Sequence, residues 1–160
     1  MRIENAKSTE SLGAIRELFV EYSKSLDVDL CFQGFAEELA GLPGQYAKPS
    51  GRLLLAHEHG QAIGCGALRR VSEEICEMKR LYVRPMARGR GAGLALINAL
   101  MKGAREIGYA KMRLDTLPSM TKAIALYRAL GFKEIAPYRY NPIPGSLFLE
   151  MALDAVTRDS

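Results

Sequence analysis

The sequence of 160 residues has no tryptophan, two histidines and three cysteines. The cysteines Cys31, Cys65 and Cys76 are odd in number and form no C-x-x-C pair, so the sequence predicts neither a disulfide framework nor a zinc site. His57 and His59 flank a turn with no third ligand near them in the sequence, so we expect no bound metal. Cysteines without a disulfide pattern are usual in a reducing compartment, and we expect a cytoplasmic location.

Long apolar segments are also missing. No window approaches the ~18 apolar residues of a membrane-spanning helix, and residues 1–30 lack the apolar run of a secretory signal. We therefore expect no membrane partner. Lys and Arg exceed Asp and Glu by 22 to 18, but no long basic run or nucleic-acid-binding motif accompanies this excess, so nucleic acid is not an expected partner either.

The length and the hydrophobic pattern predict one domain over residues 1–160. Helices are expected at about 9–22, 32–41 and 119–131, and from the glycine-rich turn at 89–93 to about 107. The order of elements predicts an α+β fold, in which helices cover both faces of a mixed sheet. Strands are expected at 1–6, 52–57, 62–68, 74–83, 111–115, 132–135 and 147–153.

The glycine-rich stretch 83–93, VRPMARGRGAG, links a predicted strand to a predicted helix. The first amides of a helix have no intrahelical partner and lie at the positive end of its dipole, so such a turn favours an anion. Glycines also let a phosphate approach the backbone closely. The stretch has no G-x-x-x-x-G-K-[ST] motif, and Leu94 stands where a dinucleotide fingerprint has its third glycine. We expect a phosphate-bearing ligand of another kind.

Two blocks resemble the GNAT N-acetyltransferase superfamily. The block Arg88-x-x-Gly91-x-Gly93, with Val83-x-Pro85 before it, is similar to the R/Q-x-x-G-x-G/A signature that cradles the pyrophosphate of acetyl-CoA. The block 123–132, AIALYRALGF, is similar to the A-x-x-L-Y-x-x-L-G-F corner of the same family. The resemblance implies acetyl-CoA as co-substrate and a mixed, mostly antiparallel sheet of about seven strands flanked by about four helices.

The implied reaction is transfer of the acetyl group of acetyl-CoA to a primary amine, by direct attack in a ternary complex. The expected acceptor is a small amine or an amino-acid-like molecule. A protein lysine or N-terminal amine stays open as acceptor, as does a non-catalytic acyl-CoA-binding or regulatory domain on the same fold. A homodimer through the C-terminal strands is possible, as in many relatives.

The resemblance also places the cofactor on two segments of this chain. The backbone of Leu81, Tyr82 and Val83, at the end of a predicted strand, is implied to bind the pantetheine arm. The glycine-rich turn is implied to bind the pyrophosphate, and its residues are Arg88, Gly89, Arg90, Gly91, Ala92, Gly93 and Leu94.

Two residues carry the implied catalysis. Tyr127 matches the family tyrosine that protonates the departing thiolate, and its alternative role is that of a core tyrosine on an amphipathic helix. Glu77 matches a position where some members carry the general base, acting directly or through water. By strand alternation it is expected to share a face with Ile75, Leu81 and Val83. The alternative for Glu77 is a structural ion pair, with Lys79 on the same face.

Three further positions stay open. Asp115 ends a predicted strand and either contacts the acceptor amine or only ends the strand. Arg139, in the loop 137–145, suits an acceptor carboxylate, unless Tyr138 and Tyr140 simply anchor that loop. Many relatives have Asn seven residues before the tyrosine, and here that position is Met120, so it receives no role.

Overall fold

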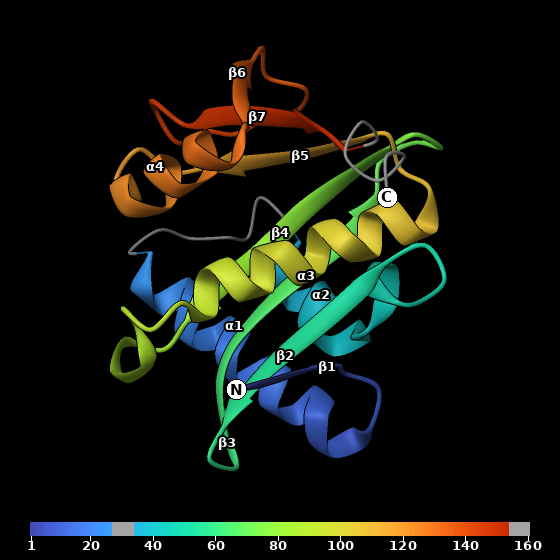
Figure 1. Ribbon diagram of the computed structural model, residues 1–160, viewed down its shortest axis with the longest axis vertical. Coiled ribbons are helices and arrows are strands. Elements are labelled where there is room, and N and C mark those ends of the chain that lie inside the picture. Colours follow the sequence, from blue (N-terminus) through green and yellow to red (C-terminus); the bar gives the residue numbers. More distant parts are fainter. Residues whose placement is uncertain (27–33, 154–160) are drawn as a thin grey trace.

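One seven-stranded sheet organises the chain, in the order β1-β2-β3-β4-β5-β7-β6. The computed structural model describes residues 1–26 and 34–153. The sheet includes both the first and the last of the described elements, which lie near its opposite edges (Figure 1). Its strands are β1 (Arg2–Asn5), β2 (Arg52–Glu58), β3 (Gln61–Arg70), β4 (Ile75–Val83), β5 (Lys111–Thr116), β6 (Lys133–Ile135) and β7 (Leu147–Ala152).

Helices cover both faces of this sheet. On one face α3 and α4 lie over the strands, and on the other lie α1 and α2 (Figure 1). Each face has its own hydrophobic core. Among the described residues, no helix combines the length and the apolar character that a membrane crossing requires. The helices are α1 (Thr9–Ser25), α2 (Phe35–Gly41), α3 (Ala92–Ile107) and α4 (Thr121–Leu130).

The helix ends follow the local sequence. Ser8 caps α1 and forms a capping box with Ser11, which satisfies two amides of the first turn. Gly108 and Gly131 end α3 and α4 in the left-handed conformation, with φ of 109° and 111°, where a side chain would be strained. The expected helix at 32–41 is present from Phe35, and its first residues lie outside the described part of the chain.

The parallel contact between β4 and β5 is short. The two strands pair only from Ile75 to Glu77 and from Lys111 to Arg113. All other strand pairs of the sheet are antiparallel. Beyond Glu77 the two strands separate, so β4 follows β3 while β5 follows β7. The prediction of a mixed, mostly antiparallel seven-stranded sheet with four helices is confirmed.

A β-bulge interrupts β4, and as a result the neighbours of Glu77 differ from those that the sequence predicts. The register of β3 with β4 shifts at this point, and Arg80 has a φ of 59°. An extra residue reverses the alternation of the side chains beyond it. Leu81 and Val83 therefore pack against the core under α3, whereas Glu77 lies on the opposite face, across from Arg69. The prediction that all three share one face is wrong.

Candidate functional site

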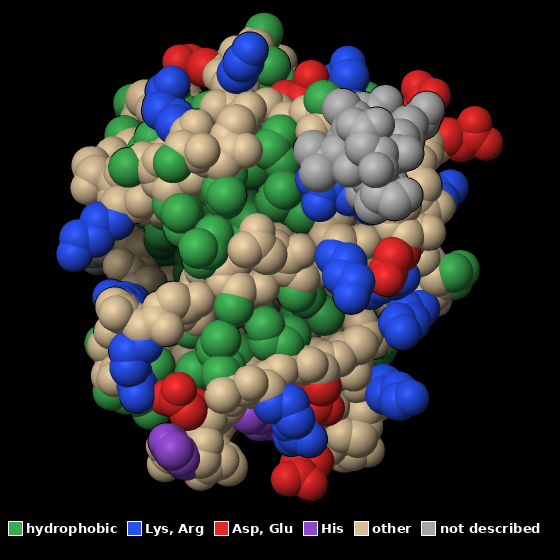
Figure 2. Space-filling model, in the orientation of Figure 1, with side chains coloured by type: hydrophobic (Ala, Val, Ile, Leu, Met, Phe, Trp, Pro, Cys, Tyr) green, Lys and Arg blue, Asp and Glu red, His purple; other side chains and the backbone are tan. Residues whose placement is uncertain are grey.

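A cleft opens where β4 and β5 separate. Figure 2 shows the surface hollowed on the left, between α4 and the start of α3, with Lys and Arg side chains near its rim. The cleft is lined by Tyr22, Leu26, Met78, Lys79, Arg80, Leu81, Leu114, Asp115, Thr116, Leu117, Met120, Tyr127 and Asn141.

The glycine-rich turn has the geometry of an anion site. Gly89 and Gly91 have φ of 81° and 84°, and a Cβ built on either would meet no atom within 4 Å. Both positions thus need glycine for their backbone and leave open space for a ligand. The first bond of α3 runs from the Ala95 amide to the Gly91 carbonyl, so the amides before Ala95 lie at the free helix end. This arrangement can hold a pyrophosphate.

Two arginines flank the turn in different ways. Arg88 donates from Nε to the Val83 carbonyl at 2.9 Å, and its guanidinium lies 5.8 Å from the ring centroid of Tyr82. Arg90 pairs with Glu58 at 2.7 Å, and about half of its side chain is exposed. Arg88 therefore joins the end of β4 to the glycine-rich turn, while Arg90 lies at the surface.

The end of β4 borders the cleft, which Leu81 lines but Tyr82 and Val83 do not. Leu81 packs towards α3, whereas Tyr82 turns to the other face, where its hydroxyl donates to Glu21 at 3.3 Å. Because β5 has already separated, no strand of the described residues lies beside the edge of β4 that faces β5 at this point. The Val83 carbonyl at this end already accepts from Arg88 Nε, and other backbone groups along such an open edge can bind an amide-bearing chain such as pantetheine.

Tyr127 comes into the cleft from α4. The residue is 6% exposed and packs edge-to-face against Phe132. Burial raises the pKa of its hydroxyl above the usual value for tyrosine, so the group is protonated at neutral pH and can donate a proton. Both interpretations of Tyr127 from the sequence fit this position, because its ring belongs to the core and the residue also lines the cleft.

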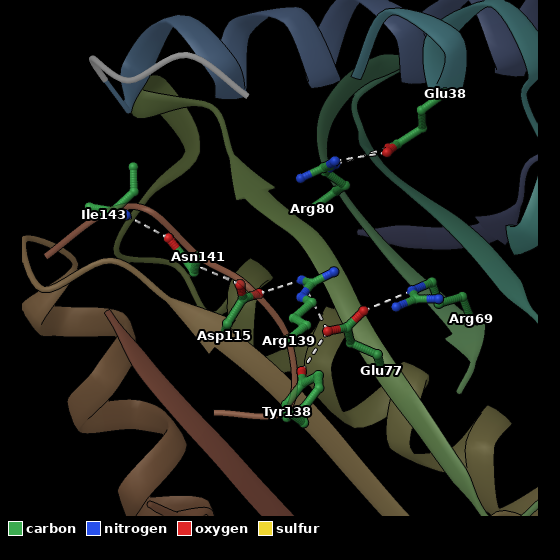
Figure 3. A network of polar contacts seen from close by, with 9 residues as sticks. All are labelled: Glu38, Arg69, Glu77, Arg80, Asp115, Tyr138, Arg139, Asn141 and Ile143. Carbon is green, nitrogen blue, oxygen red and sulfur yellow. Dashed lines mark hydrogen bonds and ion pairs between the residues drawn. The ribbon is translucent and has the colours of Figure 1, made fainter. Parts of the chain in front are cut away.

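Glu77 lies in a polar network at the point where the strands separate (Figure 3). The residue is fully buried. Its Oε1 accepts from Arg69 Nε at 2.7 Å, and its Oε2 lies 3.1 Å from Arg139 Nη2 and accepts from the Tyr138 hydroxyl. Burial, and next the charge of Glu77, raise the pKa of Tyr138, so this hydroxyl stays the donor. The structural ion pair left open by the sequence is therefore present, with Arg69 and Arg139 as partners.

Asp115 accepts hydrogen bonds from the loop that carries Arg139. Arg139 Nη2 donates to its Oδ1 at 2.9 Å, and Asn141 Nδ2 donates to its Oδ2 at 3.1 Å. Arg139 thus bridges Glu77 and Asp115 (Figure 3). An acceptor carboxylate would have to compete with two carboxylates for this guanidinium, so the alternative of an anchored loop describes Arg139 better. Tyr140, at 77% exposure, does not serve as an anchor.

Several groups of the cleft were not identified from the sequence. Arg80 is buried, donates to both oxygens of Glu38 at 2.9 and 2.7 Å, and lies over the ring of Phe35. Lys79 also lines the cleft, and burial and then Arg80 lower its pKa to about 8. The sequence does not predict these contacts, because α2 and β4 are far apart along the chain. The bulge that changes the orientation of Arg80 also has no recognisable sequence motif. Met120 does line the cleft.

Comparison with known proteins gives consistent matches. Residues 14–132 match the model of the acetyltransferase (GNAT) family. An uncharacterized N-acetyltransferase of Schizosaccharomyces pombe is 38% identical over 153 residues, which cover 94% of this chain and 94% of that protein.

Solved structures agree with these matches. An acetyltransferase from Streptococcus agalactiae has a TM-score of 0.79 at 21% identity and covers 95% of this chain and 98% of its own, which shows a common fold. A GNAT family acetyltransferase from Elizabethkingia anophelis with acetyl-CoA bound has a TM-score of 0.56 at 27% identity and covers 65% of this chain and 77% of its own.

Proposed function

This chain belongs to the acetyltransferase (GNAT) family, with acetyl-CoA as its co-substrate, and we propose that it moves the acetyl group to a primary amine by direct attack in a ternary complex. The observation that carries this proposal is the cleft between β4 and β5, which Tyr127 and Asp115 line from different elements. Such a cleft can align an amine with a thioester and convert a bimolecular step into one within a complex.

The proposed cofactor site runs from β4 to the start of α3. The backbone of Leu81, Tyr82 and Val83 would bind the pantetheine arm along the open edge of β4. The helix end would bind the pyrophosphate, supported by the left-handed glycines and the open space around them. The residues proposed for this part are Arg88, Gly89, Arg90, Gly91, Ala92, Gly93 and Leu94.

The proposed chemistry needs one proton donor and one proton acceptor. The neutral amine attacks the thioester carbonyl, the C–N bond forms, the C–S bond breaks, and the thiolate leaves. Tyr127 donates its proton to the thiolate sulfur. The new amide nitrogen loses the proton it carried as an amine, and Glu77 is the proposed acceptor of that proton. Because its carboxylate is covered by Arg69, Arg139 and Tyr138, it would act through a hydroxyl or water.

Substitution Glu77→Gln tests this base. Gln cannot take up a proton, so kcat/KM should fall about 10²-fold and lose its acid limb, which reports protonation of the base. The measurement is the pH profile of kcat/KM. Tyr138→Phe is the companion variant: it removes the hydroxyl but keeps both arginine pairs of Glu77. An acid limb that persists in Glu77→Gln would leave Glu77 only as the anchor of the two arginines.

The acceptor is proposed to be a small primary amine. In an assay of thiol release, acetyl-CoA with tyramine, putrescine, lysine or glycylglycine should give free CoA only when the amine is present. A peptide with a free N-terminus or lysine side chain tests the protein-acetyltransferase alternative. Tight acetyl-CoA binding by calorimetry without release from any of these acceptors would favour the non-catalytic binding domain and contradict the proposal.

The remaining expectations stay predictions. We propose that residues 1–160 form one acetyltransferase domain, which is supported by the sheet that joins β1 to β7. A cytoplasmic location is supported by the two free, buried thiols Cys65 and Cys76, and Cys31 lies outside the described residues. A homodimer through the C-terminal strands is proposed by resemblance alone, and sedimentation would test it.

A further inference from the structure

Arg139 bridges the two strands that separate to form the cleft. Its guanidinium comes from the loop between β6 and β7 and contacts one carboxylate on each of the two separating strands, Glu77 on β4 and Asp115 on β5 (Figure 3). Glu77 is the last residue of β4 that pairs with β5. The loop therefore fixes the two strands at the point where the cleft begins.

The two carboxylates that Arg139 contacts differ in their access to the cleft. Glu77 is fully buried, and groups of the protein contact both of its oxygens. The Asp115 side chain is 9% exposed and lines the cleft together with Tyr127. Among the described residues that line the cleft, Asp115 carries the only carboxylate. In the described part of the chain, Asp115 is therefore the acidic partner for a cationic group that enters the cleft.

Asp115 still has hydrogen-bonding capacity. Each carboxylate oxygen can accept about two hydrogen bonds, and one donor is present at each: Arg139 at Oδ1 and Asn141 at Oδ2. These two bonds hold the carboxylate plane, and Asn141 is itself fixed by the amide of Ile143 at 2.9 Å. Among the contacts of the described residues, one lone pair on each oxygen is left for a ligand.

We propose that Asp115 binds the amine of the acceptor and that Arg139 and Asn141 position its carboxylate for this contact. The inference rests on the proposed acetyltransferase function. A primary amine reaches the protein mainly as an ammonium ion, and a carboxylate in a partly desolvated cleft attracts it more strongly than one in water.

The test is steady-state kinetics of Asp115→Asn with tyramine, putrescine, lysine and glycylglycine, using the amine that the wild type acetylates fastest. Loss of a hydrogen bond to a charged group should raise the KM of that amine about tenfold or more. The KM of acetyl-CoA should stay within about twofold, because the contact belongs to the acceptor. Glu150→Gln is the matched control. It removes a comparable carboxylate that pairs with Arg113 at 2.7 Å on the same sheet but does not line the cleft, and it should leave both KM values unchanged.

A separate set of KM measurements tests the positioning role of Arg139. Arg139→Met should raise the KM of the amine as Asp115→Asn does, and the double variant should raise it no further, since both changes remove one contact. Arg139→Lys should restore part of the loss. If Arg139→Met does not fold, Arg139→Lys and Asn141→Ala give the same comparison. Full additivity of the two single changes would overturn the positioning role.

The outcomes separate this inference from the function on which it rests. A wild-type protein that acetylates a probe, with an amine KM unchanged in Asp115→Asn, overturns the inference and leaves the acetyltransferase intact. A wild-type protein that releases no CoA with any probe contradicts the proposed function, and the assignment of Asp115 is then rejected with it.

Discussion

Replacement of Tyr127 by phenylalanine is expected to lower kcat about 10³-fold and to leave the Kd of acetyl-CoA unchanged. The substitution removes one oxygen atom and keeps the ring, which packs edge-to-face on Phe132 at a centroid distance of 5.7 Å. Binding of the cofactor does not need the proton, whereas departure of the thiolate does. The loss should therefore appear in turnover and not in affinity.

The surroundings of the hydroxyl keep its proton in place. Burial raises the pKa of Tyr127 above its usual value, so the proton is present across the neutral pH range. Water reaches a buried sulfur poorly and would replace the phenol only in part. Tyr46→Phe is the matched control, because Tyr46 is equally a buried tyrosine but does not line the cleft. Wild-type turnover in Tyr127→Phe would return this residue to the role of a core tyrosine.

Local sequence was sufficient for the parts of the site that form within one segment. The glycines at 89 and 91 predicted a tight turn at a helix start, and both have positive φ in the structure. The stretch 123–132 predicted a helix that ends at Gly131, and it does. In both cases the residues that define the conformation are neighbours in the chain. The family and the fold inferred from these two blocks are confirmed.

Contacts between distant segments were not predictable in the same way. The partners of Glu77 come from β3 and from the loop after β6, 8 and 62 residues away. Arg69 is followed by Arg70, so the sequence could not select it, and the sequence placed Arg139 in its loop without indicating that it pairs with Glu77. The bulge at Arg80 also changes which side chains share a face with Glu77. No turn-forming residue in β4 predicts this bulge. The Asp115 network likewise depends on the loop after β6, which supplies Arg139 and Asn141.

The glycine-rich turn gives the prediction with the largest effect on binding. Gly91→Glu should weaken acetyl-CoA binding by about 100-fold or more, equivalent to ~2.7 kcal/mol or more. Gly91 caps α3 with a φ of 84°, and the space beside it is open. A glutamate side chain would enter that space with bulk and with a negative charge, at the helix end that favours anions.

Strain alone could mimic part of this loss, so the control must share the backbone conformation. Gly60, in the hairpin between β2 and β3, has a φ of 77° and equally open surroundings. Gly60→Glu should therefore cost a similar ~1–2 kcal/mol of stability, measured by thermal denaturation, while calorimetry shows an unchanged Kd for acetyl-CoA. The difference between the two variants isolates the effect on the ligand. Equal Kd values for Gly91→Glu and the wild type would mean that the pyrophosphate binds elsewhere and that the turn only begins the helix.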